Sequence, residues 1–162
     1  MGLVALSSAP AIAGTETSNL TVSATVPSNC QLTTTPLNFG NYDPIVVNAS
    51  SVLDGTNNTA IAITCTDGTA FTYGVAQGQN PASGSTALNP LRQMANGAAR
   101  LRYDLYRNSG RTQIWGDIGT ANVRSGVGDG NESFFGLYGR IPAGQNVPVG
   151  NYSDTVTVTV SF

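Results

Sequence analysis

Residues able to do chemistry are few in this sequence, and their types exclude most catalytic schemes. Histidine is absent, which removes the commonest general base and a common metal ligand together. The nine carboxylates are scattered, and no spacing favours two of them as an acid and base pair. They are Glu16, Asp43, Asp54, Asp67, Asp104, Asp117, Asp129, Glu132 and Asp154. We therefore expect no enzyme activity, no cofactor and no metal.

Three clusters could in principle bind a ligand, and each has a plainer interpretation. One set of carboxylates and aromatic rings could line a sugar site, namely Asp117, Asp129, Tyr106 and Trp115. Residues 126–131 are glycine-rich but lack the Lys-Ser/Thr pair of a phosphate loop, so we expect a flexible hairpin connection. Residues 54–58 offer oxygen ligands without the spacing or the distal Glu of a calcium loop, which predicts a turn.

The two cysteines, Cys30 and Cys65, are an even pair whose meaning depends on export. Residues 1–13 form an apolar run ending in Ala-Ile-Ala, which is typical of a secretory signal, although the usual basic residue at its start is missing. Free thiols remain an alternative, but with no histidine and no third cysteine a zinc site is disfavoured. Export to an oxidising compartment predicts a Cys30–Cys65 disulfide.

Composition limits the partners and the size of the fold. The 162 residues, 40% of them hydrophobic, suffice for one domain with its own core. All seven basic residues are arginine and the net charge is −2, which disfavours nucleic acid as a partner. Beyond the first residues, no stretch reaches the roughly 18 to 20 apolar residues of a membrane helix, so the mature chain is not expected to span a membrane.

Alternation of apolar and polar residues is the strongest structural signal. It recurs at residues 20–26, 60–65, 71–75, 101–106 and 156–162, which predicts half-buried strands. Clusters of Asn, Asp, Ser and Gly between these segments predict turns. Many short strands joined by glycine-rich turns favour an all-β sandwich of the immunoglobulin-like type.

Local signals add detail to this sandwich. Residues 103–115 predict a strand, a tight turn and a returning strand. Apolar residues spaced by three within residues 87–102 allow one helical turn, interrupted by Pro90. Tyr152 stands just before the last strand, where sandwich folds place a tyrosine whose hydroxyl bonds to nearby backbone.

The last alternating segment runs to Phe162, so a further strand beside it is expected to come from elsewhere. From pattern alone, residues 20–26 are equally compatible with an ordinary first strand of this domain and with a strand given to another molecule.

Several stretches resemble, in order and spacing, the spore coat U domain family, and within it the major subunits of archaic chaperone–usher pili such as the Csu pilus. They are residues 29–32 (NCQL), 37–43 (LNFGNYD), 63–65 (ITC), 101–107 (LRYDLYR), 115–117 (WGD), 139–145 (GRIPAGQ) and 150–160 (GNYSDTVTVTV).

This resemblance implies an incomplete immunoglobulin-like sandwich that lacks its last strand and is completed by donor-strand exchange. A periplasmic chaperone and an outer-membrane usher would assemble a homopolymer at the cell surface, a pilus that supports adhesion and biofilm formation. Residues 14–27 correspond to the donor strand and 28–162 to the pilin domain. The donor residues would be Leu20, Val22, Ala24 and Val26, and the acceptor strand would carry Val156, Val158, Val160 and Phe162. The alternative is a secreted spore-coat or glycan-binding adhesive protein that acts as a discrete unit.

Overall fold

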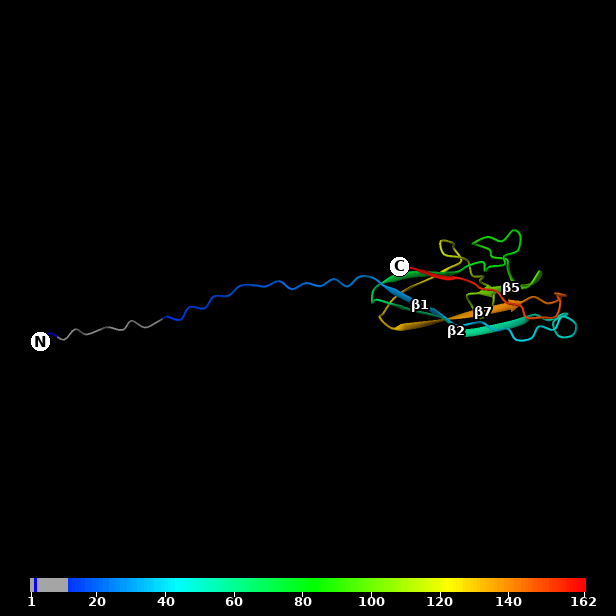
Figure 1. Ribbon diagram of the computed structural model, residues 1–162, viewed down its shortest axis with the longest axis horizontal. Coiled ribbons are helices and arrows are strands. Elements are labelled where there is room, and N and C mark those ends of the chain that lie inside the picture. The colour runs from blue at the N-terminus through cyan, green and yellow to red at the C-terminus, as the bar shows by residue number, and fades with distance from the viewer. Residues whose placement is uncertain (1, 3–11) are drawn as a thin grey trace.

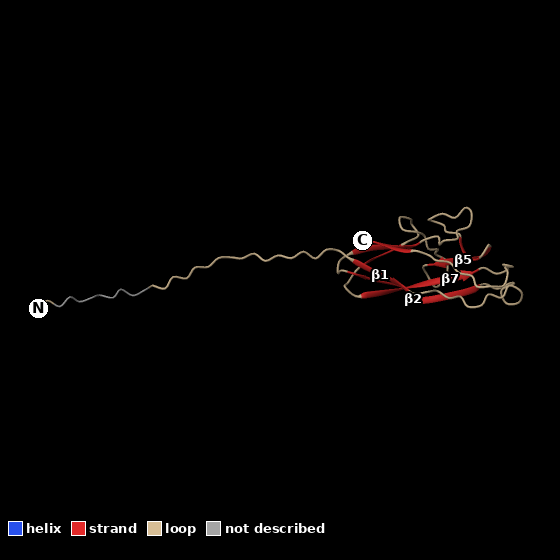
Figure 2. Ribbon diagram, viewed as in Figure 1, coloured by secondary structure: helices blue, strands red, loops and turns tan. Residues whose placement is uncertain are grey.

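The protein is built from β-strands that pack as two facing sheets. The computed structural model describes residue 2 and residues 12–162, and there the chain forms strands, turns and loops (Figure 1 and Figure 2). The strands are β1 (Cys30–Thr34), β2 (Leu53–Cys65), β3 (Ala70–Val75), β4 (Arg92–Asn96), β5 (Ala99–Tyr106), β6 (Arg124–Val127), β7 (Glu132–Ile141) and β8 (Val158–Ser161). In the described part of the chain, no helix is long and apolar enough to span a membrane. The predicted all-β sandwich is confirmed.

Every strand pair is antiparallel, as expected for strands that alternate between a core face and a solvent face. The larger sheet has the order β1-β2-β7-β5-β4, and the smaller sheet has the order β6-β3-β8. Strand β1 is therefore one edge of the larger sheet, and β8 is one edge of the smaller sheet. Residues 1 and 3–11, most of the predicted signal segment 1–13, lie outside the described residues.

The core lies between the two sheets and consists mostly of apolar residues, some of them consecutive along β2. Its most deeply buried members include Ile61, Ile63, Tyr73, Val75, Leu105 and Trp115. The ring of Tyr73 lies between two other aromatic rings, with centroid distances of 5.2 Å to Trp115 and 4.8 Å to Phe135. These contacts join the smaller sheet to the larger one across the middle of the domain.

The domain has two ends, which the strand registers define. At the proximal end, Cys30 of β1 faces Cys65 of β2, Thr64 faces Glu132 at the start of β7, and β8 finishes nearby. The N-terminal segment leaves the domain here (Figure 1). At the distal end lie the loop of residues 35–52, the β4–β5 turn and residues 142–152.

A disulfide between Cys30 and Cys65 ties β1 to β2 at the proximal end, as predicted. The bond spans 35 residues of sequence and should stabilise the fold by roughly 3 to 4 kcal/mol.

The helical turn expected within residues 87–102 is wrong, because this segment contains strand β4. Pro90 disfavours a helical conformation at the residue before it and supplies no backbone N–H. Residues Arg92–Asn96 instead pair with β5 through a tight turn at Gly97, whose φ of 57° is left-handed. The spacing of three among Leu88, Leu91 and Met94 was too short a pattern to define a helix face.

Three predicted connections differ from the structure. The turn expected at residues 54–58 is wrong, because this stretch lies within β2 and pairs with β7. Residues 103–115 do reverse direction, since Trp115 donates its N–H to the Leu105 carbonyl at 2.9 Å, but the return is a single bridge, between Tyr106 and Ile114. Residues 126–131, expected to close a hairpin, instead cross from β6 in the smaller sheet to β7 in the larger one. A Cβ on Gly128 would stand 2.6 Å from that of Cys65, so this connection lies tight against β2.

The structural role expected for Tyr152 is confirmed. Its hydroxyl donates to the Pro148 carbonyl at 2.8 Å and closes the turn that leads into the last strand.

Candidate functional site

An apolar groove of about 390 Å³ lies where the edge strands of the two sheets face each other. One rim is the end of β1 with the residues that follow it, and the other is the segment leading into β8. The floor comes from both sheets and includes Ile61, Val75, Leu105 and Leu137. Edge strands also present a row of backbone groups that their own sheet does not use. The groove thus offers an apolar floor together with hydrogen-bonding rims.

The groove continues toward the distal end as a second hollow of about 900 Å³. Leu37, Phe39 and Met94 line both parts, and Ile45 and Val149 stand at the distal limit. Phe39 can lie flat on the larger sheet because Gly55 and Gly139 face each other beneath it. A Cβ on Gly139 would overlap Cζ of Phe39, so a side chain there would collide with this wall.

The β8 rim is held in place by Asp154, which lines the groove. Its carboxylate accepts hydrogen bonds from the Tyr103 hydroxyl at 2.7 Å, the Gln79 N–H at 3.0 Å and the Asn80 side chain at 3.2 Å. Burial, and then the hydrogen bond to Asp154, raises the pKa of Tyr103 above its usual range, so the hydroxyl stays a donor. These bonds tie residues 152–157 to the loop after β3.

The predicted acceptor residues do not all lie together. Val156 and Val158 line the groove, and Val160 packs against the core beside them. Phe162 is 55% exposed and lines a separate hollow with Phe71 at the proximal end. The structure therefore joins three of the four predicted residues into one apolar rim.

The predicted donor residues lie in a segment that forms no strand within this chain. Leu20, Val22 and Val26 are 88%, 86% and 79% exposed, and Ala24 is exposed as well. The segment extends away from the domain and joins neither sheet (Figure 1). An alternating apolar stripe left in solvent is a surface that needs a partner.

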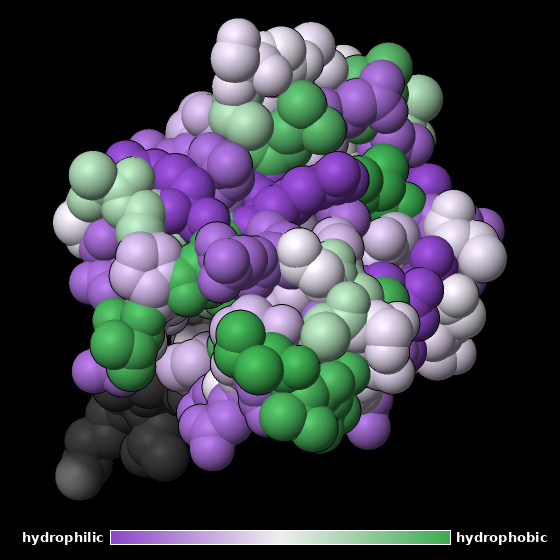
Figure 3. Space-filling view, turned by 90° about the vertical axis from the view of Figure 1, so that its right-hand side faces the viewer, coloured by the Kyte–Doolittle hydropathy of each residue, from purple (hydrophilic) through white to green (hydrophobic). Residues whose placement is uncertain are grey.

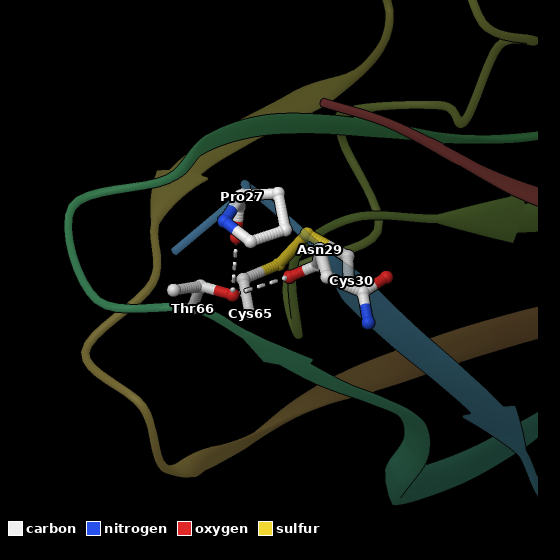
Figure 4. Close-up of a disulfide and its surroundings, with 5 residues drawn as sticks. All are labelled: Pro27, Asn29, Cys30, Cys65 and Thr66. Carbon is white, nitrogen blue, oxygen red and sulfur yellow. Dashed lines mark hydrogen bonds between the residues drawn. A yellow bond between two sulfur atoms is a disulfide. The ribbon is translucent and has the colours of Figure 1, made fainter. Parts of the chain in front are cut away.

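The base of this segment is fixed to the domain beside the disulfide (Figure 4). The Thr66 N–H donates to the Asn29 carbonyl at 2.9 Å, and the Thr66 hydroxyl lies 3.4 Å from the carbonyls of both Pro27 and Asn29. The free part of the chain therefore ends at Val26.

The residues that could have formed other sites serve the framework. Trp115 is fully buried against Tyr73, so its ring cannot stack on a sugar. Asp129 accepts the Asn131 N–H at 2.9 Å, which lowers the pKa of its carboxyl, and it closes a turn. Within the described residues, no group of three potential metal ligands comes together.

The Spore Coat Protein U domain model matches residues 16–159, nearly the whole chain. The chain belongs to this family. Among members of known sequence, Protein U of Myxococcus xanthus is 40% identical over 166 residues, and the alignment covers 99% of this chain and 91% of that protein. The family resemblance inferred from the sequence motifs is confirmed.

A solved structure shares the fold of this Spore Coat Protein U domain. It is the CsuC–CsuE chaperone–tip adhesion subunit pre-assembly complex from archaic chaperone-usher Csu pili of Acinetobacter baumannii, with a TM-score of 0.58 and 21% sequence identity. The match covers 85% of this chain and 41% of that chain, so the domain spans less than half of the solved protein's length.

Several residues that line the groove of this Spore Coat Protein U domain were not predicted from the sequence. Leu37 and Phe39 alternate with polar residues, a signal for one apolar face, but the stretch is too short to stand out as a strand. Met94 was not predicted as a groove residue because its spacing from Leu88 and Leu91 was interpreted as part of a helical turn. The run of Ile45, Val46 and Val47 has no alternation, and its exposure could not be predicted from type alone.

Proposed function

We propose that this chain is a structural subunit of an extracellular fibre and that it polymerises by donor-strand exchange. The observation that carries the proposal is that one chain holds both an open apolar groove between two sheet edges and a detached alternating segment. The segment offers an apolar stripe without a partner, and the groove offers apolar surface and free strand edges that such a segment could cover. The family and the fold shared with a pilus subunit complex support this assignment.

Residues 14–27 of one copy insert into the groove of the next, with Leu20, Val22, Ala24 and Val26 directed at its floor. Strand addition of this kind combines ladder hydrogen bonds with side chains placed in pockets at alternate positions. Burying the three larger residues contributes about 5 to 8 kcal/mol before the cost of ordering the segment. That energy suits a stable non-covalent polymer.

The positions of the groove and of the base of the segment support one direction of insertion. The larger of the two hollows lies toward the distal end of the acceptor, and the free segment of a donor leaves from the donor's proximal end. A donor entering at the distal mouth runs antiparallel to β8 of the acceptor, with Val26 at the mouth and Leu20 deepest. Copies then follow one another head to tail.

An assembly of this kind needs the route that the resemblance implies. The open groove of an unassembled subunit is an aggregation hazard, because it exposes apolar surface beside unpaired strand edges. We propose that a periplasmic chaperone covers the groove until an outer-membrane usher joins successive subunits at the cell surface. Adhesion and biofilm formation are the proposed roles of the finished fibre.

Peptide binding and polymerisation test the proposal together. A chain lacking residues 14–27 should bind a synthetic peptide of those residues but form no fibres. The full chain should run on a denaturing gel as a ladder of polymers that disappears on heating. Serine at Leu20, Val22 and Val26 of the peptide should abolish binding. Alanine at the intervening Thr21, Ser23 and Thr25 is the matched control and should bind normally. Fibres of ordinary length from the deletion would refute donor-strand exchange.

A discrete secreted coat protein is the second candidate, favoured by the family name and by the match across 91% of Protein U. Such a protein would run as a monomer on a sizing column at all concentrations, and its residues 14–27 would be dispensable for surface attachment. Sizing of the purified chain therefore separates the two candidates.

A further inference from the structure

The distal end of the domain carries an exposed apolar patch that the core does not explain. We define the distal patch as Ile45, Val46, Val47 and Val149, which are 75%, 71%, 61% and 100% exposed. The face turned toward the viewer in Figure 3 is this end of the molecule, and a hydrophobic cluster stands out on it. Consecutive exposed apolar residues are unusual on a soluble surface and indicate a contact site.

The loop that presents the patch is built rigidly. Asp43 accepts hydrogen bonds from the N–H groups of Ile45 and Val46, both at 3.0 Å. The side chain of Asn48, which is only 2% exposed, accepts the Asp43 N–H at 2.9 Å. A loop ordered by its own hydrogen bonds loses little further entropy when it binds.

Tyr42 joins this loop to the other part of the patch. Its hydroxyl donates to the Pro142 carbonyl at 2.9 Å and accepts the Gln145 N–H at 3.0 Å. These bonds hold the loop of residues 43–48 beside the segment that continues to Val149. The distal patch is therefore one preformed surface at the mouth of the groove, where Ile45 and Val149 are also lining residues.

The proximal end carries apolar residues of its own. Val127 is 66% exposed and Phe162 is 55% exposed, and both line a shallow hollow at the end of β3, β6 and β8. The domain therefore has exposed apolar surface at both ends. Two different patches at opposite ends are the requirement for a heterologous, head-to-tail contact.

The short connection between donor segment and domain brings these two ends together. Only residues 27–29 separate Val26 from Cys30, and they reach at most about 14 Å when fully extended. Thr66 holds the carbonyls of Pro27 and Asn29, which shortens the free reach further. A copy whose Val26 fills the distal mouth must place its proximal end close to the acceptor's distal patch.

Charge at the two ends is complementary. Asp67, Asp129 and Glu132 lie in the turns at the proximal end, and the strand registers place none of the seven arginines there. Arg100 and Arg102 follow the β4–β5 turn at the distal end and are exposed. The patch loop carries one acid, Asp43, which keeps its charge, and Arg102 lies 3.5 Å from Asp104, so the excess of positive charge at the distal end is small. An acidic end against arginines favours this pairing over two like ends.

We propose that the distal patch docks on the proximal end of the next copy and forms a second subunit contact beside the inserted donor strand. This proposal rests on the proposed function, because the donor strand is what brings the two ends together. The contact limits bending between neighbouring subunits, since two attachments fix an orientation that one strand leaves free. The bound partner is a second copy of this chain.

Thiol labelling of assembled fibres tests the contact, because both native cysteines are in the disulfide. A Val46→Cys chain should react with a maleimide about tenfold more slowly in fibres than unassembled, since the core of an interface excludes solvent. A Val127→Cys chain should show the same protection from the other side. Ser109→Cys, in an exposed turn on the side of the domain, is the matched control and should label equally in both forms.

The outcomes separate this contact from the donor-strand mechanism. Fibres in which Val46→Cys labels as fast as in the unassembled chain would overturn the contact and leave donor-strand exchange standing. Those fibres could then be tested for binding to phenyl-coated beads. If they bind and the Ile45→Ser and Val47→Ser fibres do not, the distal patch is a site for an external apolar surface. A chain that forms no fibres and binds no peptide of residues 14–27 would overturn both proposals.

Discussion

At the scale of single residues, the shape of the groove depends both on the side chains that line it and on glycines that leave room for them. Phe39 reaches its place in the wall only because Gly55 and Gly139, paired on β2 and β7, leave a slot beneath it. Tyr103 and Asp154 fix the opposite rim through a hydrogen bond of 2.7 Å. Small changes at these positions should alter binding of a peptide of residues 14–27, the proposed donor segment, before they unfold the domain.

Gly139→Ala tests the slot. The added methyl group would overlap Phe39 and come within 2.7 Å of Leu37, and such overpacking costs about 1 to 3 kcal/mol. Urea denaturation should show that loss, and calorimetry should show weaker binding of the peptide of residues 14–27. Gly110→Ala is the control, because a Cβ there would meet only the side-chain nitrogen of Asn108, at 3.3 Å. Unchanged peptide affinity in a folded Gly139→Ala chain would mean that Phe39 is not part of the binding wall.

Asp54 gives the fold a specific dependence on acid. Arg140 donates two hydrogen bonds to its carboxylate, at 2.7 and 3.0 Å, and this pairing lowers the pKa of Asp54 below 3.8. A lowered folded-state pKa means that the stabilisation is complete above about pH 4 and is lost as the pH falls through the folded value. The pair is partly exposed, so the effect is modest and weakens with salt.

Urea midpoints of the wild type and of Asp54→Asn, measured from pH 7 to pH 2.5, check this dependence. The wild type should be the more stable chain at neutral pH, and the difference should shrink only below about pH 4. A difference that stayed constant down to pH 2.5 would show that the carboxylate charge contributes nothing at this position.

At the scale of secondary structure, alternation located parts of β2, β3 and β5 but did not predict β7, a strand of 10 residues at the centre of the larger sheet. Residues 60–65, 71–75 and 101–106 fall within β2, β3 and β5 because their inward residues fill one core. Strand β4 could not be found from its sequence, because Arg92 points inward where an apolar residue would be expected. Its place is decided by partners distant in sequence.

Arg92 is the clearest example of a residue whose position depends on contacts distant in sequence. It is fully buried, and its guanidinium donates to the carbonyls of Val75, Ala76 and Trp115 at 2.6 to 3.1 Å. Burial lowers its pKa to about 10, so the group remains charged at neutral pH. Arg92 thus ties β4, on the edge of the larger sheet, to the end of β3 in the smaller one.

Arg92→Met should therefore destabilise the domain by about 3 kcal/mol or more, since the carbonyls it serves lose charge-assisted bonds while staying buried. Arg92→Lys should recover only part of the loss, because an ammonium cannot match the planar fork. Thermal unfolding measures both. If methionine were tolerated as well as arginine, the buried charge would have no net stabilising role.

The candidate site could be predicted from the sequence in part. The alternation of Leu20, Val22, Ala24 and Val26 was visible, and family motifs indicated its proposed destination. The distal patch and the Leu37 and Phe39 wall were not visible, because an apolar residue in a short loop is equally compatible with core, groove and surface. Only the arrangement of both sheets shows which of these each residue occupies.

At the scale of the whole molecule, the fibre proposed here is held by four side chains of unequal size, and Ala24 is the smallest. Replacing it with valine adds two carbon atoms to the buried side chain, worth about 1.6 kcal/mol if the pocket has room. Ala24→Val fibres should therefore dissociate at a higher temperature than wild-type fibres. Ser23→Val, which creates the same β-branched side chain at the neighbouring outward position, should leave that temperature unchanged. Because both variants raise β-propensity alike, a rise in both would trace the gain to strand formation, and a fall in Ala24→Val alone would show that the groove is already full at this position.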